Sequence, residues 1–157
     1  MTILPLAEFR TSVAPRHRLL GLDLGEITIG LALSDMLLTV ATPYGILRRA
    51  KFDANAEELE RVVKTEGVGG FVIGLPLNMN GSDGPSAQSA RAFARNLAVR
   101  SDLPVLLWDE RLSTAAVQRD MIAADVTRKR RARSVDKAAA AYILQNALEA
   151  MRNLPPI

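Results

Sequence analysis

The hydrophobic positions in the first third of the chain follow the short period of β-strands. Residues 18–25 and 28–35 are mostly apolar runs separated by a short turn, which predicts the two strands of a hairpin. A third run, 37–47, is rich in β-branched residues and predicts a neighbouring strand, and Pro43 within it favours an edge strand or a bulge. We therefore expect a three-strand antiparallel meander at the start of the fold.

The period changes after residue 50, where helical stripes alternate with short apolar runs. One amphipathic helix is predicted to end at Gly67, and a second is predicted to begin at Pro85. The runs 68–76 and 104–108 are apolar throughout, which is typical of strands buried on both faces of a parallel sheet. The pattern predicts an α/β protein with a mixed five-stranded sheet, built from the meander and two parallel strands and flanked by helices.

The last part of the chain indicates two helices on either side of a basic block. The stripe from Leu112 to Ala123 predicts one helix, and the stripe from Val135 to Ala150 predicts the final helix, with Ser134 as its N-cap. We expect residues 125–133 to interrupt the two helices. This segment holds five clustered cations: Arg128, Lys129, Arg130, Arg131 and Arg133. Such a block is typical of a nucleic-acid contact, and a solvated loop that aids solubility is the simpler alternative.

Residues 1–17 show no sustained period and are punctuated by Pro5 and Pro15. We expect an N-terminal tail that is largely unstructured or loosely docked. The remaining residues, 18–154, are enough for a single domain with its own core. No run is long and apolar enough to span a membrane, and the first residues lack the layout of a secretion signal. A cytoplasmic protein without a membrane partner is therefore expected.

The composition narrows the possible chemistry. The chain has no cysteine and a single histidine, His17. Disulfides and thiolate sites are excluded, and neither serine–histidine catalysis nor a histidine-based zinc site is expected. Any catalytic centre has to be built from carboxylates, hydroxyls or bases. The net charge of +3 and the isoelectric point of about 9.7 give a mild basic bias, which suits an anionic partner.

Carboxylates are predicted to gather at one edge of the sheet. Asp23 lies near the end of the first strand, and Asp109 and Glu110 follow the last strand. The polar loop 75–85 leaves a further strand, and sites in open α/β sheets form at the carboxyl ends of parallel strands. Asp136 opens the final helix with its i+4 and i+7 neighbours on the inner stripe, so we expect it to point toward the sheet. Simpler alternatives stay open, since the turn could satisfy Asp23 and Asp136 could complement the helix dipole.

Several carboxylates on one edge repel one another, and divalent cations relieve that repulsion. Mg²⁺ prefers hard oxygen ligands and keeps several of its waters. A pair of such ions activates water and stabilises the leaving oxygen when a phosphodiester is cleaved. The carboxylates and the basic block therefore fit one hypothesis, in which the cations hold a phosphate backbone and the acids hold the metal.

Four blocks of the sequence resemble a known family. They are GLDLGEITIGLALSD (21–35), GLPLNMNGSDGPSAQSARAFA (74–94), WDERLSTAAVQ (108–118) and SVDKAAAAYILQ (134–145). On these blocks the chain, from about residue 18 to 151, resembles the YqgF-type, Holliday-junction-resolvase-like proteins. That family has the ribonuclease H-like fold, and its members are described as nucleases of pre-16S rRNA.

The resemblance implies a nuclease site that depends on a divalent metal. Matched to the family's motifs, Asp23, Glu110 and Asp136 are the catalytic acids and the ligands of Mg²⁺ or Mn²⁺, with Asp109 as an accessory. The family usually carries one or two basic residues just before the Ile-Gly of the first block, where this chain has Glu26 and Thr28. A cation is thus lost and an acid is added close to Asp23. The loop at 81–84 and the basic block are candidates to compensate.

The expected nucleic-acid contacts are the basic block, Arg111 and the polar loop residues Asn78, Asn80 and Ser82. Arg111 could equally pair only with Asp109, and the loop could be a mere connection. The function expected from the resemblance is maturation of the 5′ end of pre-16S rRNA during ribosome biogenesis. Cleavage of branched DNA is the alternative substrate, and a monomer or a homodimer would suit either.

Two other classes of function have some support in the sequence. The DLGxxxxG pattern that starts at Asp23 also resembles the phosphate loop of actin-like sugar kinases and ATPases. Those enzymes close two such domains on a nucleotide, and this chain is long enough for only one. A non-catalytic RNA-binding factor in ribosome assembly would keep the basic block while its acids did no chemistry, and the departure at Glu26 and Thr28 favours it.

Overall fold

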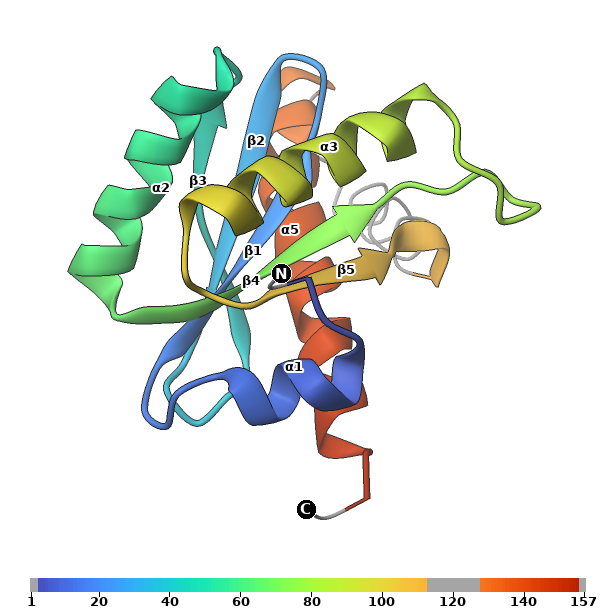
Figure 1. The fold of residues 1–157 in the computed structure, drawn as a ribbon. Coiled ribbons are helices and arrows are strands. Elements are labelled where there is room, and N and C mark those ends of the chain that lie inside the picture. The colour runs from blue at the N-terminus through green and yellow to red at the C-terminus, as the bar shows by residue number, and fades with distance from the viewer. Residues whose placement is uncertain (1–2, 113–127, 156–157) are drawn as a thin grey trace.

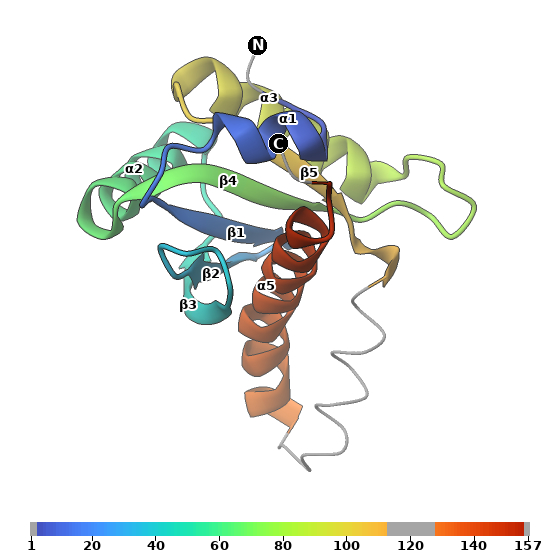
Figure 2. The same cartoon turned by 90° about the horizontal axis from the view of Figure 1, so that it is seen from below.

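The computed structural model describes residues 3–112 and 128–155, with side chains for 3–111 and 138–155. Its five-stranded sheet has the strand order β3-β2-β1-β4-β5 (Figure 1). The pairs β1–β2 and β2–β3 are antiparallel, and the pairs β1–β4 and β4–β5 are parallel. Helices α2 and α3 lie on one side of the sheet and α5 lies on the other (Figure 2). The mixed sheet predicted from the hydrophobic pattern is therefore confirmed.

The elements lie close to the ranges that the pattern predicts. The strands are β1 (Arg18–Leu24), β2 (Thr28–Ser34), β3 (Ala41–Arg48), β4 (Val68–Leu75) and β5 (Val105–Asp109). The helices of the domain are α2 (Phe52–Glu66), α3 (Pro85–Arg100) and α5 (Arg128–Arg152), and the 3-10 turn η1 (Glu110–Leu112) follows β5. The signals at the helix ends are confirmed, because Gly67 closes α2 with a left-handed φ of 68° and Pro85 begins α3.

Strand β3 forms one edge of the sheet, as Pro43 suggested. The pairing of β2 with β3 contains a register shift between Leu31 and Ala32, opposite Pro43. Proline has no amide hydrogen to give to a ladder, so an edge strand with a bulge is the place where it is tolerated. The shift does not reach the pairing of β1 with β2, which is regular from Leu20 to Leu24.

Alternate residues of β1 face the two helical layers. Leu20 and Leu22 belong to the core under α2 and α3, whereas Leu19 belongs to the core under α5. Gly21 also faces α5, since a Cβ there would lie 2.9 Å from Leu144 Cβ and 3.2 Å from the carbonyl oxygen of Ala140. The glycine thus lets α5 approach β1 closely, two residues before Asp23 on the same face.

The N-terminal segment is ordered, so the prediction of a largely unstructured tail was wrong. Leu6–Ser12 form helix α1, and Phe9 on it is fully buried in the core beside α5. The guanidinium of Arg10 donates hydrogen bonds to the carbonyl oxygens of Met151 (3.1 Å) and Pro155 (2.8 Å) at the end of α5. A cation is favourable at a helix C-terminus. A seven-residue helix with one buried side chain is too short to show a period in the sequence.

Helix α5 includes the basic block, so the prediction of an interruption there was also wrong. The helix is described from Arg128 onward, and its N-terminal part projects away from the sheet (Figure 2). Arginine and lysine have high helix propensity, and a projecting helix needs no apolar stripe to hold it on the core. The helix predicted from Leu112 to Ala123 falls almost entirely on residues outside those described. No helix in the described ranges is long and apolar enough to cross a membrane.

Candidate active site at the carboxyl edge of the sheet

Strands β1, β4 and β5 run parallel, so their carboxyl ends meet at one edge of the sheet. Asp23 is the last but one residue of β1, and Glu110 opens η1 directly after β5. The polar loop 76–84 leaves β4 between them. The structure therefore brings together three of the features that the sequence predicted to converge.

Asp23 and Glu110 are in direct contact through a side-chain hydrogen bond. Glu110 reaches Asp23 across β4, and it can do so because the residue beneath it is Gly74. A Cβ at Gly74 would lie 2.8 Å from Glu110 Cδ and 2.7 Å from Ile143 Cδ1 of α5. The carboxyl group of Glu110 is thus half-buried in a narrow space between β4 and α5, and only a glycine leaves that space open.

The surroundings of Glu110 favour its neutral form. Burial, the negative charge and hydrogen bond of Asp23, and the charge of Asp109 together raise the pKa of Glu110 to about 8. Near neutral pH a protonated Glu110 therefore donates a hydrogen bond to Asp23. Two carboxyl groups that share one proton are a site where a divalent cation can take the proton's place.

The oxygen-only donor set of Asp23 and Glu110 fits Mg²⁺ or Mn²⁺, which bind through few carboxylates and keep waters. Within the described ranges no three His, Cys, Asp or Glu side chains lie close enough together to hold an ion. The backbone of Asp136 lies on α5 one turn before Ala140, whose carbonyl is close to Gly21. The side chains of Asp136 and of the block Arg128–Arg133 lie outside those that the structure describes.

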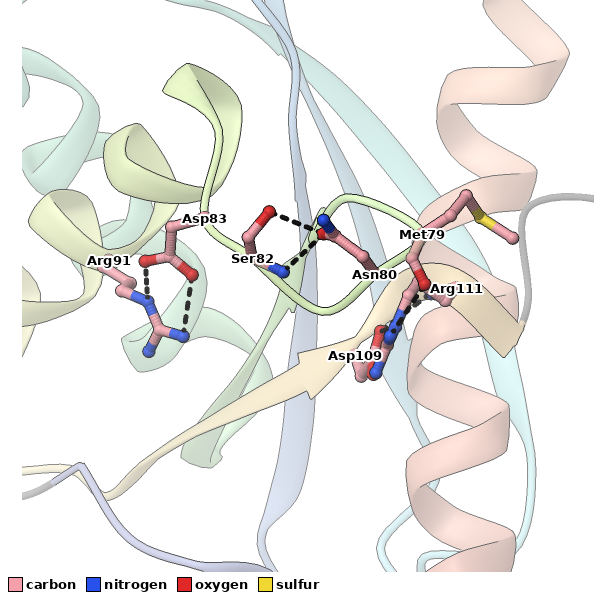
Figure 3. Close-up of polar contacts among 7 residues, drawn as sticks. All are labelled: Met79, Asn80, Ser82, Asp83, Arg91, Asp109 and Arg111. Atoms are coloured by element: carbon pink, nitrogen blue, oxygen red, sulfur yellow. Dashed lines mark hydrogen bonds and ion pairs between the residues drawn. The ribbon is translucent and has the colours of Figure 1, made fainter.

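Asp109, next to Glu110, has a partner of its own (Figure 3). Arg111 Nη2 lies 2.6 Å from Asp109 Oδ2, and the Nε of the same arginine also donates to this carboxylate at 2.9 Å. The hydrogen bonds from Arg111 lower the pKa of Asp109 below its ordinary value. Arg111 Nη1 further donates to the carbonyl oxygen of Met79, at 3.3 Å. Arg111 thus links the end of β5 to the loop. It pairs with Asp109, and its contact with nucleic acid stays a prediction.

The loop after β4 is held in shape by its own polar side chains. Asn78 Nδ2 donates to Ser82 Oγ at 3.0 Å. The backbone N–H of Ser82 donates to Asn80 Oδ1 at 3.0 Å (Figure 3). Gly81 supplies the left-handed φ of 87° that the turn needs. Asn78, Asn80 and Ser82 are all exposed, and Met79 at the tip is 86% exposed. The loop therefore presents a fixed surface beside the acids, and its role as a nucleic-acid contact stays a prediction.

Sequence reasoning missed two residues of this region. The first is Gly74, for which a signal existed, because an isolated glycine inside an apolar strand often marks a close approach. The second is Arg49, which follows the edge strand β3 and reaches the turn after β1. Its Nη1 donates to the carbonyl oxygen of Gly25 at 2.7 Å, and its Nη2 donates to Ser89 Oγ at 2.9 Å. No local pattern links Arg49 to that turn, since the contact depends on the pairing of strands.

Comparison with known proteins shows which proteins this chain is related to. The family model described as "RuvX: Holliday junction resolvase" matches residues 17–150. A protein of Paramagnetospirillum magneticum named "Putative pre-16S rRNA nuclease" is 57% identical over 149 residues, covering 95% of this chain and 96% of its own. A protein of Rhodospirillum rubrum with the same name is 53% identical over 157 residues, covering 99% and 98%.

Among solved structures, the RuvC of T. thermophilus in complex with a Holliday junction substrate superposes with a TM-score of 0.55. The sequences are 14% identical, and the match covers 87% of this chain and 96% of RuvC, so it bears on the fold alone. The fold is the ribonuclease H-like fold shared with these resolvases. On the family match and the identity with full-length relatives, this chain belongs to the RuvX, or YqgF-type, family of Holliday-junction-resolvase-like nucleases.

Proposed function

We propose that this protein is an endonuclease that uses Mg²⁺ or Mn²⁺ to process the 5′ end of pre-16S rRNA in the cytoplasm. The observation that carries the proposal is the Asp23–Glu110 pair at the shared carboxyl edge of β1, β4 and β5. Two half-buried acids in contact resist full ionisation. Such a pair lowers the stability of the fold, but it favours the binding of a cation. The substrate is inferred from the names of the relatives.

The acids, the residues that position them and the basic block have separate roles in this proposal. Asp23, Glu110 and Asp136 hold the metal, and the bound metal supplies an activated water and stabilises the charge on the leaving oxygen. Gly74 lets Glu110 reach Asp23, and Asp109 with Arg111 fixes the start of η1 behind Glu110. The cations at 128–133 lie on the part of α5 that precedes Asp136, and they bind the phosphate backbone.

The test is a cleavage assay on a pre-16S rRNA fragment that includes the 5′ precursor sequence. Wild-type protein and Asp23→Asn are incubated with Mg²⁺, with Mn²⁺ and with a chelator. We expect a defined cut that needs the metal and is lost in Asp23→Asn. Binding of the fragment without any cut, under all three conditions, would contradict the nuclease and favour a non-catalytic assembly factor.

Cleavage of branched DNA is the second candidate function. The description of the matching family model, as a Holliday junction resolvase, is the observation that favours it. The same assay with a four-way DNA junction separates the two candidates. Symmetric cutting of a junction requires two active sites, so we expect that substrate to be cut only if the protein is a homodimer in solution. Processing of the rRNA end needs a single site and is compatible with a monomer.

A further inference from the structure

A small cleft lies beside the turn that follows Asp23, between that turn and the start of α3. Its volume is about 170 Å³. The polar residues that line it are Glu26 of the turn, Arg49, and Ser86 and Ser89 of α3. The cleft begins at Leu24, which follows Asp23 in β1 but faces the opposite side of the sheet. The cleft therefore lies on the α3 side of the end of β1, and the acid pair lies on the α5 side.

Arg49 is held in place at the wall of this cleft. Its two hydrogen bonds, to Gly25 and to Ser89, join the turn to α3. Its guanidinium carbon also lies 6.0 Å from the centre of the Phe93 ring. A guanidinium has five N–H donors, and these two bonds use only part of that set. Arg49 is therefore a positioned cation that keeps donors for an anion.

The start of α3 makes the same cleft more favourable for an anion. The N-cap residue of α3, Gly84, offers no side chain to the first amides, and the first turn contains no acidic residue. Free amides at the start of a sixteen-residue helix attract negative charge. The hydroxyl groups of Ser86 and Ser89 add donors. Glu26 acts in the opposite direction and weakens the attraction.

We propose that Arg49 and this cleft bind one backbone phosphate of the nucleic acid, away from the phosphate that is cleaved, where the strand passes the end of β1 on the α3 side of the sheet. The inference rests on the proposed nuclease function and adds a subsite to it. It also explains the departure at Glu26 and Thr28, because Arg49 brings to the turn, from the end of a different strand, the cation that the turn lacks.

The experiment measures binding to a fluorescent pre-16S rRNA fragment and to a four-way DNA junction by anisotropy over a range of KCl concentrations. Calcium replaces magnesium in order to suppress cleavage. In Arg49→Gln we expect roughly tenfold weaker binding of the substrate that wild type prefers. The slope of log K against log[KCl] is negative, and we expect it to become shallower by about 0.7 to 0.9, the value for one lost phosphate contact. Arg49→Lys keeps the charge, and we expect it to keep the slope.

Arg48→Gln is the matched control. Arg48 precedes Arg49 in the chain, ends β3, is exposed, and is not among the residues that line the cleft. We expect its affinity and slope to equal those of wild type. If Arg49→Gln fails to fold, Ser86→Asp tests the cleft independently. An acid in the first turn of α3 favours the helix but repels a phosphate, so we expect a fold at least as stable as that of wild type and weaker binding.

Failure of this inference differs from failure of the proposed function. Wild-type affinity and slope in both Arg49→Gln and Ser86→Asp would overturn the subsite while leaving the nuclease intact. A wild-type protein that binds neither nucleic acid would overturn both. Equal losses in Arg49→Gln and Arg48→Gln would also overturn the subsite, because general positive charge would then explain them.

Discussion

Two carboxyl groups adjacent in the sequence, Asp109 and Glu110, have opposite surroundings. Asp109 closes strand β5 and lies against the guanidinium of Arg111, which lowers its pKa. Glu110 turns inward over Gly74, where burial and Asp23 raise its pKa to about 8. One acid is thus ionised and has a cation as partner, whereas the other is neutral near pH 7 and has a second acid as partner.

These opposite surroundings allow only one of the two acids to change partners. The charge of Asp109 is already balanced, and its ion pair fixes the loop and the start of η1. The Asp23–Glu110 pair holds a proton that a metal ion can replace, so its charge is available to a ligand. We propose that the surroundings, more than the type of residue, give Asp109 a structural role and Glu110 a catalytic one.

We expect the largest difference in cleavage rate between variants that neutralise Glu110 and Asp109 separately. We expect Glu110→Gln to lower cleavage by more than about 100-fold, since substitutions one shell further from a metal already cost 10- to 100-fold. Asp109→Asn keeps the shape and loses only the ion pair with Arg111, so its loss is expected to be much smaller. Single-turnover cleavage rates of the two variants measure the contrast. Equal losses would mean that Asp109 also takes part in the chemistry.

A methyl group placed under Glu110 tests the position of this carboxyl group without removing it. Gly74→Ala puts a Cβ 2.8 Å from Glu110 Cδ, so the carboxyl group has to move away from Asp23. A displacement of about 1 Å costs on the order of 100-fold in rate. Gly45→Ala on β3 is the control, because a Cβ there meets nothing within 4 Å. Full activity in Gly74→Ala would show that the position of Glu110 does not matter.

The raised pKa of Glu110 makes stability depend on pH in a definite direction. In the unfolded chain this carboxyl titrates near its ordinary value of 4.5, and in the folded protein it titrates at about 8. Between these two values the folded state binds more protons, so the free energy of unfolding falls as the pH rises from about 4.5 to 8. Glu110→Gln has no carboxyl group to titrate here, so it lacks this pH dependence of stability.

This pH dependence of stability is measured by thermal unfolding in the presence of a chelator, from pH 5 to 8.5. We expect wild type to lose stability relative to Glu110→Gln with increasing pH. Asp109→Asn is expected to keep most of this loss, because the charge of Asp109 is the smallest of the causes that raise the pKa of Glu110. A constant difference between wild type and Glu110→Gln across the window would contradict the raised pKa.

The smallest effect on cleavage is expected from a change at Arg111, the partner of the ionised Asp109. Arg111→Gln releases Asp109 and the carbonyl of Met79 without touching Asp23 or Glu110. We expect a loss in cleavage rate of less than about tenfold, from a less well positioned loop. Faster amide exchange in the loop 76–84 would accompany it. Loss of cleavage as severe as in Glu110→Gln would mean that Arg111 contacts the substrate.

The strands that carry this site could be predicted from the sequence, but the contacts between its side chains could not. Apolar runs and helix-end signals placed β1, β4 and β5, and parallel strands then bring Asp23 and Glu110 to one edge. No local pattern could show the contact of Glu110 with Asp23 across Gly74, because it depends on the register of three strands. For the same reason Arg49 was missed, and α1 was missed because one buried phenylalanine makes no period.

In the proposed site, a metal ion replaces the proton held between Asp23 and Glu110. The most direct measurement is the number of protons released when Mg²⁺ is titrated into the wild-type protein at pH 7 in weak buffer. We predict release of up to about one proton per chain, falling at pH 9, and none in Glu110→Gln. Magnesium binding without proton release, or equal release from Glu110→Gln, would contradict the claim.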